Sequence, residues 1–166
     1  MPTNTEPVRP GEPADAAALA CCHHRCWLHA FADLVTPPEA VDQMDPDRNL
    51  ERFSDWLSPM SDPEVTVVER DGQVVGYSTV VGNELVHLFV DPDQAGRGYG
   101  RRLLAAAEEH MVDAGYRMLE LHTMVGNDPA IGLYESAGWQ MTDQLVHTDN
   151  DNGVSYDEHV LVKHLT

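Results

Sequence analysis

Positive charge is what this sequence has least of. Its 166 residues include one lysine, Lys163, and nine arginines against 28 acidic side chains, so the formal net charge is -18. A surface of this sign repels the phosphates of nucleic acids and anionic lipids. The composition therefore argues against a nucleic-acid partner and against binding to a membrane surface. It is also compatible with a high-salt habitat, which composition alone does not establish.

Cysteine and long apolar runs are also scarce. The three cysteines, Cys21, Cys22 and Cys26, fall on one short segment. An odd number so closely spaced does not form a disulfide framework and favours a reducing compartment. The longest early apolar run, residues 16–22, is too short to span a bilayer, and the first residues lack the pattern of a signal peptide. We therefore expect a cytoplasmic protein.

The length and composition are those of one globular domain. Hydrophobic residues make up 42% of the chain and charged residues 23%. With roughly 150 residues per domain, we expect residues 1–166 to form a single domain, with residues 65–163 its clearest part. No stretch of the sequence has the composition of a linker.

Hydrophobic periodicity and turn residues predict the order β-α-α-β-β-β-α-β-α-β-β. Asp15 is the expected cap of the first helix. The strand–helix–strand run through residues 84–124 is a βαβ unit, so its two strands should be parallel neighbours. The fold class is therefore α/β, a mixed sheet of about seven strands with helices on both faces. The expected helices are 16–31, 49–57, 99–113 and 129–136, and the expected strands are 5–9, 65–70, 73–81, 84–90, 117–124, 139–147 and 155–163.

The most informative stretch joins the strand that ends at Val90 to the helix that begins near Tyr99. Glycines allow a positive φ and a close approach to a ligand, and the amides at a helix start attract anions. The spacing differs from both the P-loop and the dinucleotide fingerprint. In so acidic a chain the loop suits a pyrophosphate, with a solvated turn as the alternative. Its glycines and arginines are Gly96, Gly98, Gly100, Arg97, Arg101 and Arg102.

A second motif follows the next strand. Residues 127–139, NDPAIGLYESAGW, resemble the pattern N-x-x-A-x-x-L-Y-x-x-x-G-F, with Trp139 in place of Phe. The two motifs in this order resemble the GNAT superfamily of acetyl-CoA-dependent N-acetyltransferases, over residues 65–163. The loop departs from that family's Q/R-x-x-G-x-G/A pattern, because Ala95 stands at the Gln/Arg position and Gln94 comes one residue early.

The resemblance implies a GNAT-like fold and acetyl-CoA as the acyl donor. It implies that residues 96–101 hold the pyrophosphate and that the main chain of Leu88, Phe89 and Val90 pairs with the pantetheine arm. Asn127 would bind the pantetheine or stabilise its turn. The expected cofactor-binding residues are therefore Leu88, Phe89, Val90, Gly96, Arg97, Gly98, Tyr99, Gly100, Arg101, Asn127 and Tyr134.

Amine acetylation sets three chemical requirements. The ammonium, with a pKa near 10, must lose a proton; the tetrahedral oxyanion needs hydrogen-bond donors; and the thiolate leaving group needs a proton. The resemblance makes Tyr134 the acid and a main-chain N–H near Val90 the oxyanion donor. The alternative for Tyr134 is a core aromatic residue.

The general base has two candidates. Glu84 stands where several family members carry a catalytic carboxylate or histidine, and His122 stands where others carry a catalytic glutamate. His87 ranks lower, because strand alternation puts it on the opposite face from Glu84. The alternatives are a solvated turn carboxylate, a structural histidine, or an ordered water in place of a dedicated base.

Two features of the N-terminal region have competing interpretations. Cys22 and Cys26 lie one helical turn apart and could share a metal, but no second pair completes a closed site, so we expect buried cysteines and no metal. In the family the first helices often line the acceptor pocket. Trp27, Phe31, Phe53 and Trp56 are therefore either acceptor contacts or core residues, and core packing is favoured.

The expected function is transfer of an acetyl group to a primary amine of a small molecule or peptide, by direct attack in a ternary complex. The alternatives are a non-catalytic acyl-CoA-binding or regulatory module, and an acyltransferase that uses a longer acyl chain or an oxygen acceptor. The acidic balance favours a cationic acceptor through steering. The resemblance is also compatible with a homodimer joined through the last hairpin.

Overall fold

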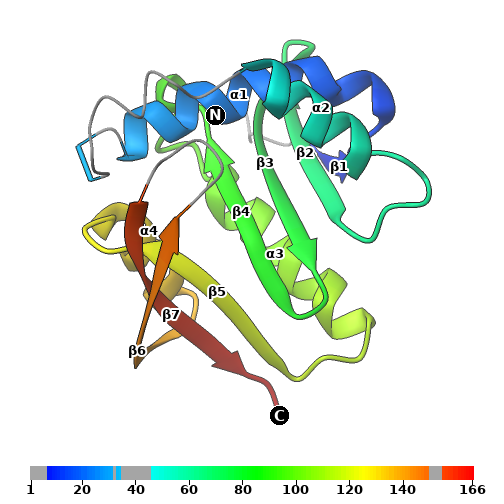
Figure 1. Ribbon diagram of the computed structural model, residues 1–166. Helices are drawn as coiled ribbons and strands as arrows, with labels where there is room; N and C mark the ends of the chain where they lie inside the picture. The colour runs from blue at the N-terminus through cyan, green and yellow to red at the C-terminus, as the bar shows by residue number, and fades with distance from the viewer. Residues whose placement is uncertain (1–6, 32, 35–45, 150–154) are drawn as a thin grey trace.

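Seven strands form one mixed sheet in the order β1-β2-β3-β4-β5-β7-β6 (Figure 1). The structure is a computed structural model that describes residues 7–31, 33–34, 46–149 and 155–166, apart from the side chain of Phe31. The strands are β1 Val8–Pro10, β2 Glu64–Arg70, β3 Gln73–Val81, β4 Glu84–Val90, β5 Met118–Met124, β6 Gln140–Asp149 and β7 Ser155–His164. The helices are α1 Ala16–Phe31, α2 Pro46–Trp56, α3 Tyr99–Asp113 and α4 Asp128–Ser136, with short 3-10 turns at Pro13–Asp15 and Pro92–Gln94.

The predicted fold class and element order are confirmed, and β3, β4 and α3 have the predicted bounds. The bounds of α1 are also as predicted, whereas α2 begins at Pro46 instead of residue 49. The expected cap of α1 differs. Asp15 ends the 3-10 turn that precedes α1, where its carboxylate accepts hydrogen bonds from the Glu12 main-chain N–H at 2.7 Å and from Arg9 Nη1 at 2.8 Å. The arginine also contacts Glu69 on β2. Asp15 therefore joins β1 to the helix start as part of a capping box, instead of serving as the cap itself.

Helices cover both faces of the sheet, and each face has its own apolar core (Figure 1). On one face α1 and α2 pack Leu19, Cys22 and Phe53 against Val67 and Tyr77 of the sheet. On the other, the α3 and α4 side chains pack against strands β3, β4, β5 and β7; the cluster includes Leu104, Met111, Tyr134, Val80, Leu85, Leu121 and Leu161. The sheet is therefore the middle of three layers, with helices packed on each of its faces.

Cys22 and Cys26 lie in the first of these cores. Both side chains are buried, and their sulfur atoms are 3.8 Å apart, while Cys21 is exposed. His23 lies between them in the sequence and is hydrogen-bonded through Nδ1 to the Tyr77 hydroxyl, and burial lowers the pKa of His23 to about 3. Over the described ranges no cluster of three or more metal-ligating side chains occurs. The side chains of Cys22 and Cys26 are thus packed in the apolar core between α1 and the sheet.

A β-bulge changes the facing of side chains on β4. Val80 pairs with Leu85 but Thr79 pairs with His87, so Val86 is an extra residue on β4. The alternation shifts by one at this point. Glu84 and His87 therefore face the same side of the sheet, toward α1 and α2. The expectation that they face opposite sides is wrong, because simple alternation assumes an unbroken ladder.

Strands β4 and β5 are parallel, as predicted, but they pair over only two positions. Glu84 is level with Glu120 and Leu85 with Leu121, and beyond them the ladder ends. β5 instead pairs with β7 along its whole length, from Met118–His164 to Met124–Glu158. The carboxyl ends of β4 and β5 thus separate, which opens the sheet in its middle (Figure 1). None of the helices in the described ranges combines the length and apolar character needed to cross a bilayer.

Candidate active site

A cavity of about 550 Å³ lies where β4 and β5 separate. One half is lined by the glycine loop after β4 and by α4, and the other by the end of α1 and by β5 and β7. Both halves meet along residues 84–90 of β4. The separation of the two strands therefore connects a loop rich in main-chain amides with a pocket of side chains.

The glycine loop presents main-chain N–H groups at the start of α3. Gly96 and Gly98 have φ values of +80° and +84°, a conformation that other residues adopt only with strain. Gly98 is the N-cap and supplies no side-chain cap, and the first intrahelical bond runs from the Arg102 N–H to its carbonyl at 3.2 Å. The amides of the first turn therefore have no partner within the helix, which is the arrangement that binds anions.

Contacts from other elements hold this loop in place. The Asp91 N–H donates to the Val75 carbonyl at 2.7 Å, and its carboxylate accepts from the Asp93 N–H at 3.0 Å. Arg25 of α1 donates to the same carboxylate through Nη2 at 2.6 Å. Sequence reasoning missed the Arg25–Asp91 ion pair, because the two residues are 66 positions apart.

Gln94 comes one residue before the position where the family pattern has Gln or Arg, and it is hydrogen-bonded within the protein. Its Oε1 accepts a hydrogen bond from Arg70 Nη1 of β2 at 3.3 Å. Gln94 lines the cavity, as does Ala95. At this point the cavity is lined by Gly96, Gly98, Tyr99 and Gly100, whereas Arg97 and Arg101 do not line it.

Leu88, Phe89 and Val90 lie on the edge of β4 that borders the cavity. Their other edge pairs with β3, through Ser78, Tyr77 and Gly76 respectively. The ladder with β5 has already ended at Leu85, so an extended ligand arm can lie beside these residues as an added strand would.

Tyr134 and Asn127 reach the same cavity from α4. Tyr134 is 6% exposed and packs on Trp139, and its hydroxyl has no hydrogen-bond partner among the described residues. Burial raises the pKa of Tyr134, which keeps the phenol protonated. Asn127 is the N-cap of α4, but its side chain makes no capping hydrogen bond. Both polar groups therefore line the cavity, and neither has a side-chain hydrogen bond to the part of the chain that the structure describes.

The two candidate bases lie on the α1/α2 face of the sheet. Glu84 lines the cavity, and no described residue forms a hydrogen bond with its carboxylate. His122 also lines the cavity, and its Nε2 is 2.7 Å from Oε1 of Glu120, two residues earlier on β5. His122 is thus already engaged, whereas Glu84 is open to a ligand.

His87 has a structural environment. Its ring packs against Trp56 at 5.4 Å and Phe89 at 5.9 Å between centroids, and its buried Nδ1 has no hydrogen-bond partner within the described ranges. Burial lowers the pKa of His87 well below its usual value, so the ring is neutral. His87 also lines the cavity, so its rank as a base stays a prediction, and the argument from strand alternation does not support it.

The four N-terminal aromatic residues divide between the cavity and the core. Trp27 lines the cavity and packs with Met124 and Tyr156. Phe53 is fully buried in the α1/α2 core, and Trp56 stacks on His87. The side chain of Phe31 lies outside the described residues.

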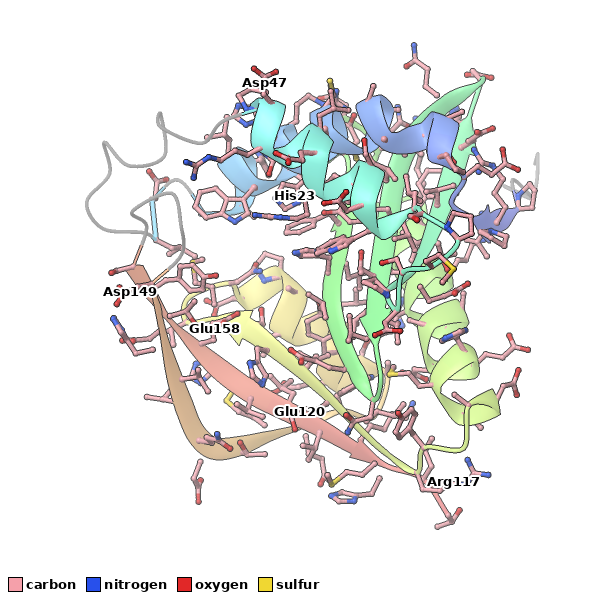
Figure 2. All side chains as sticks on the ribbon, turned by 45° about the vertical axis from the view of Figure 1, so that its right-hand side comes forward. His23, Asp47, Arg117, Glu120, Asp149 and Glu158 are labelled. Atoms are coloured by element: carbon pink, nitrogen blue, oxygen red, sulfur yellow. The ribbon has the colours of Figure 1, made fainter. Side chains whose placement is uncertain are left out.

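Sequence reasoning missed Tyr156 and Glu158 of β7. Both line the cavity. Figure 2 shows Glu158 on β7 and Glu120 on the neighbouring strand β5. Glu158 accepts a hydrogen bond from Thr148 Oγ1 at 3.3 Å. Burial raises the pKa of Glu158, against the opposing effects of the His122 charge and the Thr148 hydrogen bond, and the charge of Glu84 adds a smaller upward effect. Period-two alternation on this strand groups the two residues on one face, but only the sheet order shows which face meets the cavity.

The fold matches solved structures over nearly its whole length. A GCN5-related N-acetyltransferase from Rhodopseudomonas palustris superposes with a TM-score of 0.79 at 23% identity, covering 99% of both chains. The PaiA N-acetyltransferase from Thermoplasma acidophilum, solved with coenzyme A, gives a TM-score of 0.72 at 18% identity over 96% of this chain and 99% of its own. At these identities the likeness concerns the fold.

Curated relatives are acetyltransferases. The mycothiol acetyltransferase of Propionibacterium freudenreichii subsp. shermanii is 30% identical over 137 residues, which are 76% of this chain and 40% of the relative. An acetyltransferase from Yersinia pestis (strain Pestoides F) is 29% identical over 127 residues, 72% of this chain and 80% of the relative. The chain thus spans less than half the length of this mycothiol acetyltransferase.

The model of the acetyltransferase (GNAT) family matches residues 23–139, a span that includes the glycine loop, both candidate bases and Tyr134. This is more than half of the chain. The matched span, the shared sheet and the splayed strands that form the cavity agree with one another, and the chain belongs to the GNAT family of acetyltransferases.

Proposed function

We propose that this protein transfers an acetyl group from acetyl-CoA to a primary amine of a small molecule or peptide. The observation that carries the proposal is that one cavity contains the glycine loop, the edge of β4 and the Tyr134 phenol, which has no hydrogen-bond partner among the described residues. A cytoplasmic location and a single domain over residues 1–166 are part of the same proposal.

The donor would bind along the half of the cavity next to α3 and α4. The amides that follow Gly96 and Gly98 would hold the pyrophosphate, with Arg97 and Arg101 adding positive charge. The pantetheine arm would lie along Leu88, Phe89 and Val90, beside Asn127. The support is that the glycines, the β4 residues and Asn127 border the cavity where β4 has lost its pairing with β5; Arg97 and Arg101 lie beside it in the sequence and do not line it.

The reaction would proceed by direct attack in a ternary complex. The amine nitrogen forms a bond to the thioester carbonyl carbon, and a main-chain N–H of β4 near Val90 stabilises the oxyanion. The C–S bond then breaks, and the Tyr134 hydroxyl gives its proton to the departing sulfur. The raised pKa of Tyr134 supports this role, since the phenol is protonated at neutral pH.

The attacking amine must first lose a proton, and we assign its removal to Glu84, directly or through a water molecule. The Glu84 carboxylate lines the cavity and has no hydrogen-bond partner among the described residues, while His122 is occupied by Glu120. The acceptor would enter between α1 and β7. The cavity contains glutamates and, among the described residues, no Lys or Arg, which suits a cationic acceptor.

The test of the proposal is the change of Tyr134 to Phe. We expect Tyr134→Phe to bind coenzyme A as tightly as the natural protein does and to lower turnover at least about tenfold, because the phenol hydroxyl acts on the leaving group and not on the phosphates. Coenzyme A affinity is measured by calorimetry, and turnover by thiol release with a panel of amines.

Unchanged turnover in Tyr134→Phe would remove the assigned role of the phenol. Coenzyme A binding without thiol release from any amine would favour the alternative of a regulatory acyl-CoA-binding module. Tyr116→Phe is a matched control, since Tyr116 is 41% exposed after α3 and does not line the cavity.

A further inference from the structure

The acceptor half of the cavity has a second carboxylate that the proposed reaction does not use. Glu158 lies on β7 opposite Met124, and it shares a face with Tyr156, two residues before it. Glu84 lies on β4, on the far side of β5 from β7. The two carboxylates therefore line the same cavity from different strands.

Glu158 is placed to bind a positive group that the protein does not supply. All ten Lys and Arg residues lie in the described ranges, and none of them forms an ion pair with Glu158. Its partner is the Thr148 hydroxyl, which is a neutral donor. Arg52 of α2, whose charge acts on Tyr156, lies over the Trp56 ring at 5.9 Å. The charge of His122, when that ring is protonated, acts favourably on the carboxylate, but no Lys or Arg pairs with it. A half-buried carboxylate without such a pair is costly unless a ligand provides a cation.

The surroundings of Glu158 suit an alkyl ammonium. Trp27, Met124 and Tyr156 pack together in the cavity wall, with the aromatic rings on α1 and β7. Aromatic faces attract an ammonium group, and apolar side chains bury the methylene groups that carry it. Burial, and second the charge of Glu158, raise the pKa of Tyr156 to about 12, so Tyr156 remains a neutral phenol beside the carboxylate.

We propose that Glu158 is a specificity residue that binds a second positively charged group of the acceptor, so that the enzyme prefers diamines to monoamines of the same length. This inference rests on the proposed function. The amine to be acetylated lies near Glu84, and the distant ammonium group lies between Glu158 and the rings of Trp27 and Tyr156. A chain of methylene groups joins the two across the α1/α2 face of β5.

The experiment compares 1,4-diaminobutane and 1,6-diaminohexane with butylamine and hexylamine as acceptors. The natural protein is expected to have a higher kcat/KM for at least one diamine than for the matching monoamine. In Glu158→Gln the ratio of the two kcat/KM values is expected to fall at least about tenfold, mainly through the KM of the diamine. The melting temperature and coenzyme A affinity check that the variant is folded.

Asp157→Asn is the matched control. It removes the same charge one residue away, from an exposed carboxylate that is hydrogen-bonded to His147 and does not line the cavity. An equal fall of the ratio in both variants would mean general electrostatic attraction and would overturn the proposal. So would an unchanged ratio in Glu158→Gln, or no diamine preference in the natural protein. Failure to acetylate any amine would instead contradict the proposed function itself.

Discussion

At the scale of single residues, Tyr134 and Glu84 lie in different environments within the site. The Tyr134 phenol is buried on the α4 side and stays protonated, because burial raises its pKa. Glu84 lies on the opposite face of the sheet, next to the closed end of the β4–β5 ladder. The proposed acid and the proposed base are thus separated by the plane of the sheet, so a thioester between the strands would have the amine on one side and the phenol on the other.

Changing Glu84 to Gln tests this division. We expect kcat/KM for an amine to fall about a hundredfold at neutral pH, because general base catalysis contributes this order of magnitude. The loss should shrink as the pH approaches 10, since the free amine then becomes abundant without a base. The pH dependence of kcat/KM for the natural protein and Glu84→Gln gives the answer.

His122→Gln is the competing variant in that measurement. A larger loss of kcat/KM in His122→Gln than in Glu84→Gln would assign the base to the histidine, and its hydrogen bond with Glu120 would then be part of the relay. Equal, small losses in both would favour an ordered water.

At the scale of elements, three local features shape the cavity. The bulge at Val86 turns Glu84 and His87 to one face, and the early end of the β4–β5 ladder leaves room for a ligand arm. The third feature is the left-handed backbone at Gly96 and Gly98, which leads into α3. A regular ladder would leave no opening, and a loop without these glycines would not lead the chain into α3 in this conformation.

Gly98→Ala and Gly72→Ala form a matched pair for the glycine loop. Both glycines have a positive φ, +84° and +78°, and an added methyl group meets no atom within 4 Å at either position. We expect each variant to lose about 1 kcal/mol of unfolding free energy through backbone strain. Because Gly72 is in the β2–β3 turn, only Gly98→Ala should weaken coenzyme A binding, by roughly tenfold.

Urea denaturation and calorimetry measure the two quantities separately. Equal coenzyme A affinity in the two variants would show that the backbone at Gly98 has no part in phosphate binding. A similar fall in affinity in both would indicate a general effect of destabilisation.

At the scale of the whole molecule, the net charge of -18 is the dominant property. Like charges repel one another in the compact state and favour unfolding. Salt weakens this repulsion, since the screening length falls from about 10 Å at 0.1 M to about 3 Å at 1 M.

We therefore expect the melting temperature to rise by several degrees between about 0.1 and 1 M NaCl. Most of the rise should occur at the lower concentrations, where screening changes most. Thermal unfolding in NaCl and in KCl measures it, with sucrose as an uncharged control. A flat or falling melting temperature would show that repulsion among the acidic residues does not limit stability.

The sequence by itself determined the order of the elements, the glycine loop before α3 and the family's motif around Tyr134, because these depend on local periodicity, on turn residues and on short spacings. The bounds of β3, β4 and α3 followed for the same reason. The facing of His87, the ion pair between Arg25 and Asp91, and the entry of Glu158 into the cavity were decided by the tertiary structure. Each depends on which strand or helix lies beside which, and long-range pairing and packing on both faces of the sheet set that order.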